Sequence, residues 1–399
     1  MATVYATINK GTLACIFEGK KVSKEYVTSK TGVKLEKLDK WLDEADALLP
    51  TIKQAKDIAA CLHIPFAGFY MNPEHVRPRL KSIPSVKNYR TLYGGVEMDD
   101  SAINIAMLDL MSERDFLIES SAENNLPLPS FTMSIVLRDD PVLWAKRIRE
   151  LLDVQLDEQY KCSSPRKFYL YLREKVEAAG VFVHCFTDVP MEMARALAIY
   201  DTTMPVIGLN DADRPPAKSF SMIHELVHIF KRESSLCNDM RSIRIEEVFC
   251  NAVAGEFLVP GEALESTLRI RDMHAPYKKQ DIVYLAEKFS VSKEVIIRRL
   301  LDAKYIDDTV YETYADEFRR DIELEKEERR IAKQEGRTLP GPKKVMSREA
   351  IDRTSSAVCK VLVAGYGNDI YSKQDIARHL GISQKHVNKF LAEVSLWNR

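Results

Sequence analysis

The segment from residue 219 to residue 230, SFSMIHELVHIF, constrains the fold more than any other part of the sequence. Written as a helix it is apolar on two sides, and the polar side chains left at its centre are His224, Glu225 and His228. A helix that is apolar on both sides is buried in a protein core. Burying two imidazoles and a carboxylate without partners is strongly unfavourable. The chain must therefore fold around this helix and supply its three polar side chains with a partner.

A metal ion would satisfy all three side chains. His224 and His228 are four residues apart, so on a helix both rings project from one face and can bind the same zinc ion. Glu225 lies about 100° further round the helix, too constrained to be a ligand but placed to hold and deprotonate a water molecule at the metal. The alternative is an amphipathic helix whose two histidines bind no metal.

A catalytic zinc site needs a third protein ligand and an open fourth position. The segment RIEEVFCNAVAGEFLVP offers Glu246, Glu247 and Glu256. We prefer Glu247, because Asn251 lies four residues further on the same helical face and its amide oxygen could accept the spare N–H of a ligating histidine. The apolar residues around it, Val248 among them, suggest that this glutamate is buried. Glu246 is the alternative, and each glutamate could instead be a surface charge in a salt bridge.

The composition narrows the class of protein. The chain has 399 residues, of which 45% are hydrophobic, and this is enough for several domains. Lys and Arg number 58 and Asp and Glu 59, so no overall charge attracts the chain to nucleic acid or membrane. The seven cysteines show no Cys-x-x-Cys spacing, which argues against disulfides or a cysteine zinc site. Since there is no signal sequence and no run of about 20 apolar residues, we expect a soluble cytoplasmic protein.

The remaining pattern predicts a mostly helical α+β protein. Three β-rich runs, 181–186, 194–201 and 204–210, predict a small, largely antiparallel sheet. Helices are expected over 216–233 and about 243–258, and Pro260 ends the second of these.

The chain divides into five expected regions: a helical region (1–75), a connector with a helical segment (76–130), the domain with the sheet and the histidine helix (131–310), a charged linker (311–345) and a small C-terminal helical unit (346–399). In the first region, Ser23 and Thr51 stand at helix N-cap positions, and Gly32 stands where a helix pair would turn.

Several segments together resemble the ImmA/IrrE family of zinc metallopeptidases. They are MPVIGLNDADRPPAKSFSMIHELVHIF, IEEVFCNAVAGEFLVP and LAEKFSVSKEVIIRRLLD. In that family a strand ending in Asn precedes a helix of the HELGH type. The resemblance implies a zincin-like catalytic domain that binds Zn²⁺ through His224, His228 and Glu247. It also implies that Glu225 is the catalytic base and that Asn251 accepts a hydrogen bond from one of the ligating histidines.

The match has departures. Val227 replaces a usual glycine, Cys250 replaces a usual alanine, and the run Phe220-Ser221-Met222-Ile223 replaces a Phe-Thr-x-Ala pattern. A bulkier Val227 presses on whatever packs over the metal. The first 75 residues loosely resemble a degenerate Xre-type helix-turn-helix domain of the kind often fused ahead of such peptidases.

The family resemblance implies a site-specific endopeptidase. Its substrate would be a helix-turn-helix repressor or an antitoxin encoded nearby, in a phage, mobile-element, stress or defence locus. The alternative is a transcriptional regulator that binds DNA or a partner and uses zinc only to stabilise its fold. An intact His-Glu-x-x-His favours the peptidase, because a structural zinc site does not require the glutamate between the histidines. A second donor for the oxyanion is expected, and Tyr277 and His274 are candidates.

Three segments have helix-turn-helix character: 22–42, 281–300 and 372–394. In the last, a turn-like Gly381 precedes Gln384, Lys385, His386 and Asn388, which form the most DNA-like surface of the three. Small helical tails that cover an active site look similar, so DNA contact is possible and no nucleic-acid-binding residue is assigned. No contact with a membrane is expected.

Overall fold

The computed structural model describes residues 4–83, 99–135, 137–232, 240–337 and 345–398. These residues divide into two compact units, one of Met1–Phe116 with Phe186–Ala194, the other of Leu117–Cys185 with Arg195–Arg399. The two units do not coincide with the five predicted regions, whose boundaries stay a prediction. Among the described helices, none combines the length and the apolar character that crossing a bilayer requires.

The first unit is helical. Its elements are α1 (Lys10–Lys20), α2 (Lys24–Thr31), α3 (Leu35–Leu42), α4 (Ile52–Cys61), η1 (Phe66–Tyr70), α5 (Pro73–Val76), η2 (Arg77–Arg79) and the first part of α6 (Ser101–Glu123). The expected caps are confirmed: Ser23 accepts a hydrogen bond from the N–H of Tyr26, and Thr51 forms a capping box with Gln54. Gly32 ends α2 with a φ of +70°, a conformation that favours glycine.

The second unit contains the sheet. Its strands are β1 (Phe182–Phe186), β2 (Ala196–Ile199) and β3 (Val206–Asn210), in the order β1-β3-β2. β2 and β3 are antiparallel, with Ala196 opposite Leu209, and the sheet as a whole is mixed. The helices before the sheet are α7 (Pro141–Leu151), α8 (Leu156–Lys161) and α9 (Pro165–Ala178). The α+β class with a small sheet is confirmed.

The helices after the sheet build the rest of this unit. They are α10 (Pro215–Phe230), α11 (Met240–Leu258), α12 (Gly261–Ile270), α13 (Lys279–Phe289), α14 (Lys293–Asp302) and the charged α15 (Asp308–Gln334). The C-terminal elements are α16 (Met346–Arg353), α17 (Ser356–Gly367), α18 (Lys373–His379), η4 (Gln384–His386), α19 (Val387–Ser395) and η5 (Leu396–Asn398). α10 ends three residues before the predicted limit of 233, and the last residues of the predicted linker lie outside the described residues.

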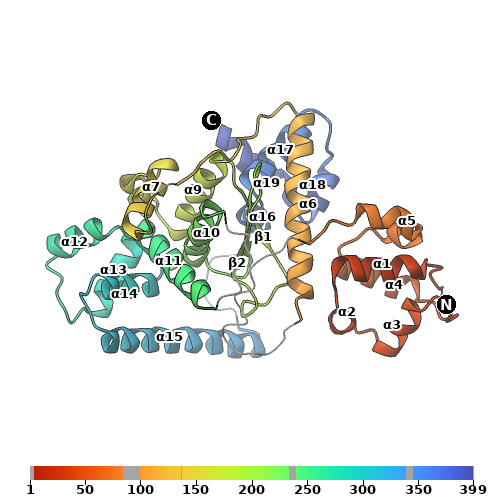
Figure 1. Cartoon of the computed structure of the whole chain (residues 1–399), viewed down its shortest axis with the longest axis horizontal. Helices are drawn as coiled ribbons and strands as arrows, with labels where there is room; N and C mark the ends of the chain where they lie inside the picture. Colours follow the sequence, from red (N-terminus) through yellow and green to blue (C-terminus); the bar gives the residue numbers. More distant parts are fainter. Residues whose placement is uncertain (1–3, 84–98, 136, 233–239, 338–344, 399) are drawn as a thin grey trace. The chain divides into compact units, whose positions relative to one another are not determined.

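The core of the second unit surrounds α10. This helix packs against α9 and α11 and against strands β2 and β3 (Figure 1). A single apolar cluster joins these elements to α13 and α14, and its fully buried members include Ile207, Met222, Phe257, Leu285 and Ile297. The histidine helix is therefore held from several sides by rigid elements.

Candidate metal centre

α10 is buried along most of its length. Pro215 and Pro216 stand in its first turn, where the helix needs no N–H and the fixed φ of proline favours helix. The side chains of Met222, Ile223, Leu226 and Val227 are completely buried. The prediction of a helix that is apolar on two sides and buried is confirmed.

The two histidines of α10 face a glutamate of α11. Nε2 of His224 lies 3.2 Å from Nε2 of His228. Oε2 of Glu247 lies 3.3 Å from Nε2 of His224, and Oε1 lies 3.1 Å from Nε2 of His228. Within the part of the chain that the structure describes, this is the one group of three His, Cys, Asp or Glu residues whose ligand atoms all lie within 4.8 Å of one another.

The separations of these atoms fit a tetrahedral zinc ion. Zinc binds imidazole nitrogen and carboxylate oxygen at about 2.0 to 2.2 Å, so two ligands of one tetrahedral ion lie about 3.3 Å apart. The measured separations of 3.2, 3.3 and 3.1 Å agree with this. Oε1 of Glu247 is also buried and makes no hydrogen bond, despite its 3.1 Å distance from His228. Two imidazole nitrogens and a carboxylate that converge in this way can share one cation.

Side chains of α11 contact the far nitrogens of both histidines. Nδ1 of His224 lies 3.0 Å from the amide oxygen of Asn251. Because that oxygen can only accept, Nδ1 carries the hydrogen and the neutral ring turns the lone pair of Nε2 toward the cluster. Nδ1 of His228 lies 3.8 Å from the thiol of Cys250, which is completely buried. In the sequence, Cys250 was noted only because it replaces the alanine that is usual in the ImmA/IrrE family. Its position three residues after Glu247, on the same helical face, was the signal for this contact.

The charges of the site differ between its two glutamates. Burial raises the pKa of Glu247, but its contacts with His224 and His228 outweigh burial and lower that pKa to about 2. Burial raises the pKa of Glu225, and the two histidines oppose this rise only in part. The imidazoles therefore favour the ionised form of Glu247, while burial favours the protonated form of Glu225.

α11 leaves this cluster open on one side. The sequence argument treated Val248 as part of a buried surface, and this was wrong: Val248 is 56% exposed and Ile245 is 67% exposed. Asn251 is also exposed, and the side chain of Glu247 keeps 26% of its surface accessible. The pattern misled because apolar side chains also occupy surfaces that face solvent.

The other two glutamates have different surroundings. Glu256 forms an ion pair with Arg299 and accepts a hydrogen bond of 2.9 Å from the N–H of Gly261. This glutamate therefore joins α11 to α12 and α14. Glu246 is next to Glu247 in the sequence but is not a member of the cluster.

The candidate oxyanion donors lie among other contacts. Tyr277 is 5% exposed, its carbonyl accepts a hydrogen bond of 2.6 Å from Tyr314, and burial raises the pKa of its phenol. His274 lies 2.9 Å from a carboxylate oxygen of Asp272, in an exposed loop. The contacts of both candidates are therefore with their own loop and with α15.

Comparison with known proteins identifies one part of the chain. The chain matches no curated protein. Residues 179–301, less than half of the chain, match the model of the M78 peptidase family, which is described as an IrrE N-terminal-like domain. The matched segment runs from β1 to α14 and contains His224, Glu225, His228, Glu247 and Asn251. The ImmA/IrrE resemblance is supported for this segment, and the match does not include the N-terminal region. Residues 179–301 are therefore similar to the IrrE N-terminal-like domain of a metallopeptidase family.

Proposed function

We propose that the protein is a zinc-dependent endopeptidase. The observation that carries the proposal is the convergence of Nε2 of His224, Nε2 of His228 and the carboxylate of Glu247, at separations that suit one zinc ion. A structural zinc site is closed by four protein ligands, whereas a catalytic site has three and an open position. Three residues converge here, and the α11 side of the cluster is exposed.

The residues of the site have separate roles in this proposal. His224, His228 and Glu247 hold the metal, and Asn251 fixes the ring of His224. A zinc ion bound here would polarise a peptide carbonyl and make water acidic enough to attack it at neutral pH. Glu225 takes the proton from the attacking water and passes it to the leaving amine.

We also propose a class of substrate. The resemblance to the ImmA/IrrE family suggests a helix-turn-helix repressor or an antitoxin encoded nearby, in a phage, mobile-element, stress or defence locus. Such a substrate would place the reaction in the cytoplasm. This proposal rests on the family match to residues 179–301 and not on the geometry of the site.

The experiment incubates the protein with the product of the adjacent reading frame, with and without zinc. We expect cleavage with zinc, loss of cleavage with Glu225→Gln while zinc is still bound, and loss of zinc with Glu247→Ala. Glu246→Ala is the matched control, because it removes a carboxylate one residue away that is outside the cluster.

The alternative is a regulator in which zinc only stabilises the fold. Such a protein would bind zinc and lose stability with Glu247→Ala, but Glu225→Gln would leave all its properties unchanged. Cleavage that survives Glu225→Gln, or that never occurs with zinc bound and the presumed substrate present, would contradict the peptidase assignment.

A further inference from the structure

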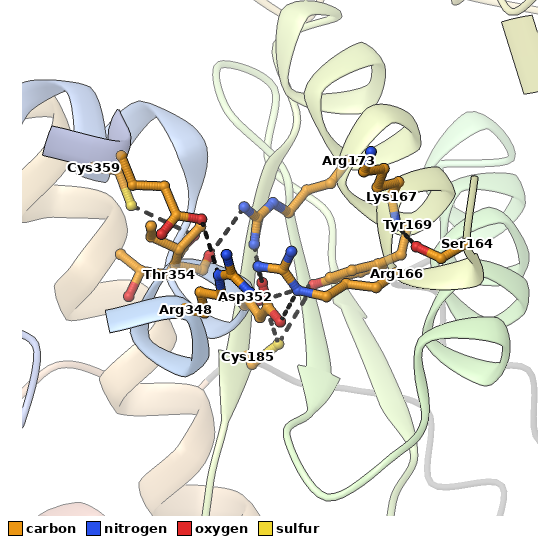
Figure 2. A network of polar contacts seen from close by, with 12 residues as sticks. Ser164, Arg166, Lys167, Tyr169, Arg173, Cys185, Arg348, Asp352, Thr354 and Cys359 are labelled. Carbon is orange, nitrogen blue, oxygen red and sulfur yellow. Dashed lines mark hydrogen bonds and ion pairs between the residues drawn. The ribbon is translucent and has the colours of Figure 1, made fainter. Parts of the chain in front are cut away.

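The C-terminal helices are fixed to α9 by a polar network (Figure 2). The guanidinium of Arg166 on α9 donates two hydrogen bonds to the carboxylate of Asp352 at the end of α16, one of them from Nε at 2.6 Å. The phenol of Tyr169 donates to the carbonyl oxygen of Asp352 at 3.1 Å. One residue of α16 is therefore held through its side chain and its main chain.

Two buried charged groups complete this network. Arg173, which is 1% exposed, donates to the carbonyl oxygens of Ile351 at 3.1 Å and Asp352 at 2.9 Å. Both carboxylate oxygens of Glu177 accept from the N–H of Ser356, at 3.1 Å each, at the start of α17. We call Arg166, Tyr169, Arg173 and Glu177 the α9 clamp. The clamp holds the junction between α16 and α17, whereas the metal cluster lies on α10 and α11.

The segment after α17 has the geometry of a helix-turn-helix. Gly381 follows α18 with a φ of +61°, which allows the chain to turn sharply. Arg353 donates a hydrogen bond of 2.5 Å to the carbonyl oxygen of Leu380 and so closes the end of α18. α19 packs against α16, α17 and α18, and the apolar side chains on both sides of the turn are buried: Ile376, Ala377, Leu380, Ile382, Val387, Phe390 and Val394. A short turn between two helices packed in this way is characteristic of DNA-binding helix-turn-helix units.

The outer face of α19 is polar and exposed. We define the α19 outer face as the exposed residues Asn388 and Lys389 in the first turn of α19, together with Ser383, Gln384 and Lys385, which lie just before it in η4 and at the N-cap of η4. In a helix-turn-helix unit, the first turns of the second helix contact base edges in the major groove. Gln and Asn can bind adenine through two hydrogen bonds, and Lys can bind guanine or phosphate.

The charge of this segment also suits DNA. Residues 373–394 contain four basic residues, Lys373, Arg378, Lys385 and Lys389, against two acidic residues, Asp375 and Glu393. This segment therefore has a net charge of +2, whereas the chain as a whole has a net charge of −1. The acidic Asp375 accepts hydrogen bonds from Ser372 at the start of α18, which places it away from the turn and α19.

The helix pair α13–α14 gives a useful contrast. Its Arg299 is 7% exposed, pairs with Glu256 and donates to the carbonyl oxygen of Val259 at 3.0 Å. Its Arg298 contacts Asp302 at 3.3 Å. Arg299 is therefore used inside the protein and Arg298, although exposed, is paired with an acidic residue of its own helix, whereas Lys385 and Lys389 of the α19 outer face are exposed to solvent.

We propose that residues 346–395 are a DNA-binding helix-turn-helix module, fixed to the peptidase domain by the α9 clamp and binding duplex DNA through the α19 outer face. Lys385 and Lys389 bind phosphates or guanine, and Gln384 and Asn388 read base edges. This activity does not depend on the peptidase proposal, since it needs neither the metal nor Glu225.

The test measures binding of the full-length protein to a labelled duplex of mixed sequence, about 40 base pairs long, from about 50 mM salt upward. We expect an affinity that falls steeply with salt. Lys385→Ala/Lys389→Ala should weaken binding at least about tenfold and lower the logarithmic salt slope by about 2. Glu225→Gln should bind DNA as the unaltered protein does.

The control is Lys146→Ala/Lys326→Ala, which removes two exposed lysines from α7 and α15 and changes the net charge by the same amount. This pair should leave the affinity within about twofold, since only phosphates that a protein contacts contribute to the salt slope. The proposal is wrong if the control pair loses as much affinity as the α19 pair, or if no duplex binds at low salt. It is also wrong if single-stranded RNA of the same length binds more tightly than the duplex.

A second measurement tests the reading of sequence. Duplexes selected from a random pool should share a short motif, and Gln384→Ala/Asn388→Ala should abolish that preference while leaving the salt slope unchanged. If the motif persists with this variant, the α19 outer face does not read the bases.

Discussion

At the scale of single residues, the sequence located most of the metal cluster because helical spacing is a local property. His224 and His228 had to share a face, and Glu247 with Asn251 repeated that spacing on the next helix. The structure brings the first three together and places Asn251 against His224. The spacing of Cys250 from Glu247 indicated a shared helical face, but the contact of Cys250 with His228 also depends on how α10 and α11 are rotated against each other, and local spacing does not give that rotation.

Asn251 gives a prediction about metal affinity. Asn251→Ala removes the acceptor 3.0 Å from Nδ1 of His224, so the ring loses its fixed orientation. Zinc affinity should fall about 10- to 100-fold, which is the usual effect of removing a group that hydrogen-bonds a metal ligand. Competition with a chelator measures this, and Asn251→Asp, which keeps an acceptor, should retain most of the affinity. An unchanged affinity with Asn251→Ala would mean that this contact does not orient the ligand.

A second residue-scale prediction concerns pH. In the first unit, Nδ1 of His63 lies 2.5 Å from Asp109, and this hydrogen bond raises the pKa of His63 although burial opposes the rise. A raised pKa in the folded state means that the pair stabilises the fold fully below the unfolded pKa, about 6.5, and that this is lost as pH rises through the folded value. Since both side chains are more than a third exposed, the effect should be below about 1 kcal/mol.

The measurement follows the free energy of unfolding against pH for the protein and for Asp109→Asn. At slightly acidic pH the unaltered protein should have a higher free energy of unfolding than Asp109→Asn, and this difference should disappear as pH rises to slightly alkaline values. His63→Asn is the companion variant, because asparagine tolerates the φ of +49° found at this position. A difference that grows with rising pH would have the wrong sign for this pair.

At the scale of elements, the sequence predicted caps and helix faces well and helix ends less well. Ser23 and Thr51 were found because capping depends on residues close in sequence. The predicted end of α10 was three residues too late, because Lys231 and Arg232 do not by themselves stop a helix. The exposure of Val248 depends on which other parts of the chain cover α11, and the spacing of apolar residues along the sequence does not show this.

Val227 gives a prediction at this scale. It stands in the middle of α10, at a position where the ImmA/IrrE family usually has glycine, and it is completely buried in the core. Val227→Gly should lower the free energy of unfolding by about 3 kcal/mol, because a buried side chain is lost and glycine disfavours helix. Val248→Gly is the control: the same change in α11 at a 56% exposed position should be much milder. Equal losses would mean that Val227 contributes little to packing.

At the scale of the whole chain, the sequence did not predict the α9 clamp. Arg173 and its partners Ile351 and Asp352 are 178 and 179 residues apart, and a buried arginine on an otherwise amphipathic α9 looks like any surface charge. Only the folded chain brings them together, and Figure 2 shows Arg173 beside Asp352. The predicted boundary of the C-terminal unit therefore contained no information on how tightly that unit is attached.

The clamp makes the last prediction. Burial raises the pKa of Glu177 and Arg173 opposes this rise, so Arg173→Met leaves a buried carboxyl group without its cation and removes the donor to the carbonyl of Ile351, while the carbonyl of Asp352 keeps its hydrogen bond from Tyr169. This should lower the free energy of unfolding by about 3 to 5 kcal/mol and expose the C-terminal helices to limited proteolysis. Arg173→Met/Glu177→Gln should recover part of the loss, because the uncompensated group is gone.

The chain offers a matched control for this experiment. Lys360 on α17 and Glu174 on α9 lie 3.8 Å apart and join the same two helices, but they are 40% and 63% exposed. Lys360→Ala should therefore change stability by less than about 1 kcal/mol. If it is as damaging as Arg173→Met, exposed charges and not the buried clamp attach the C-terminal helices.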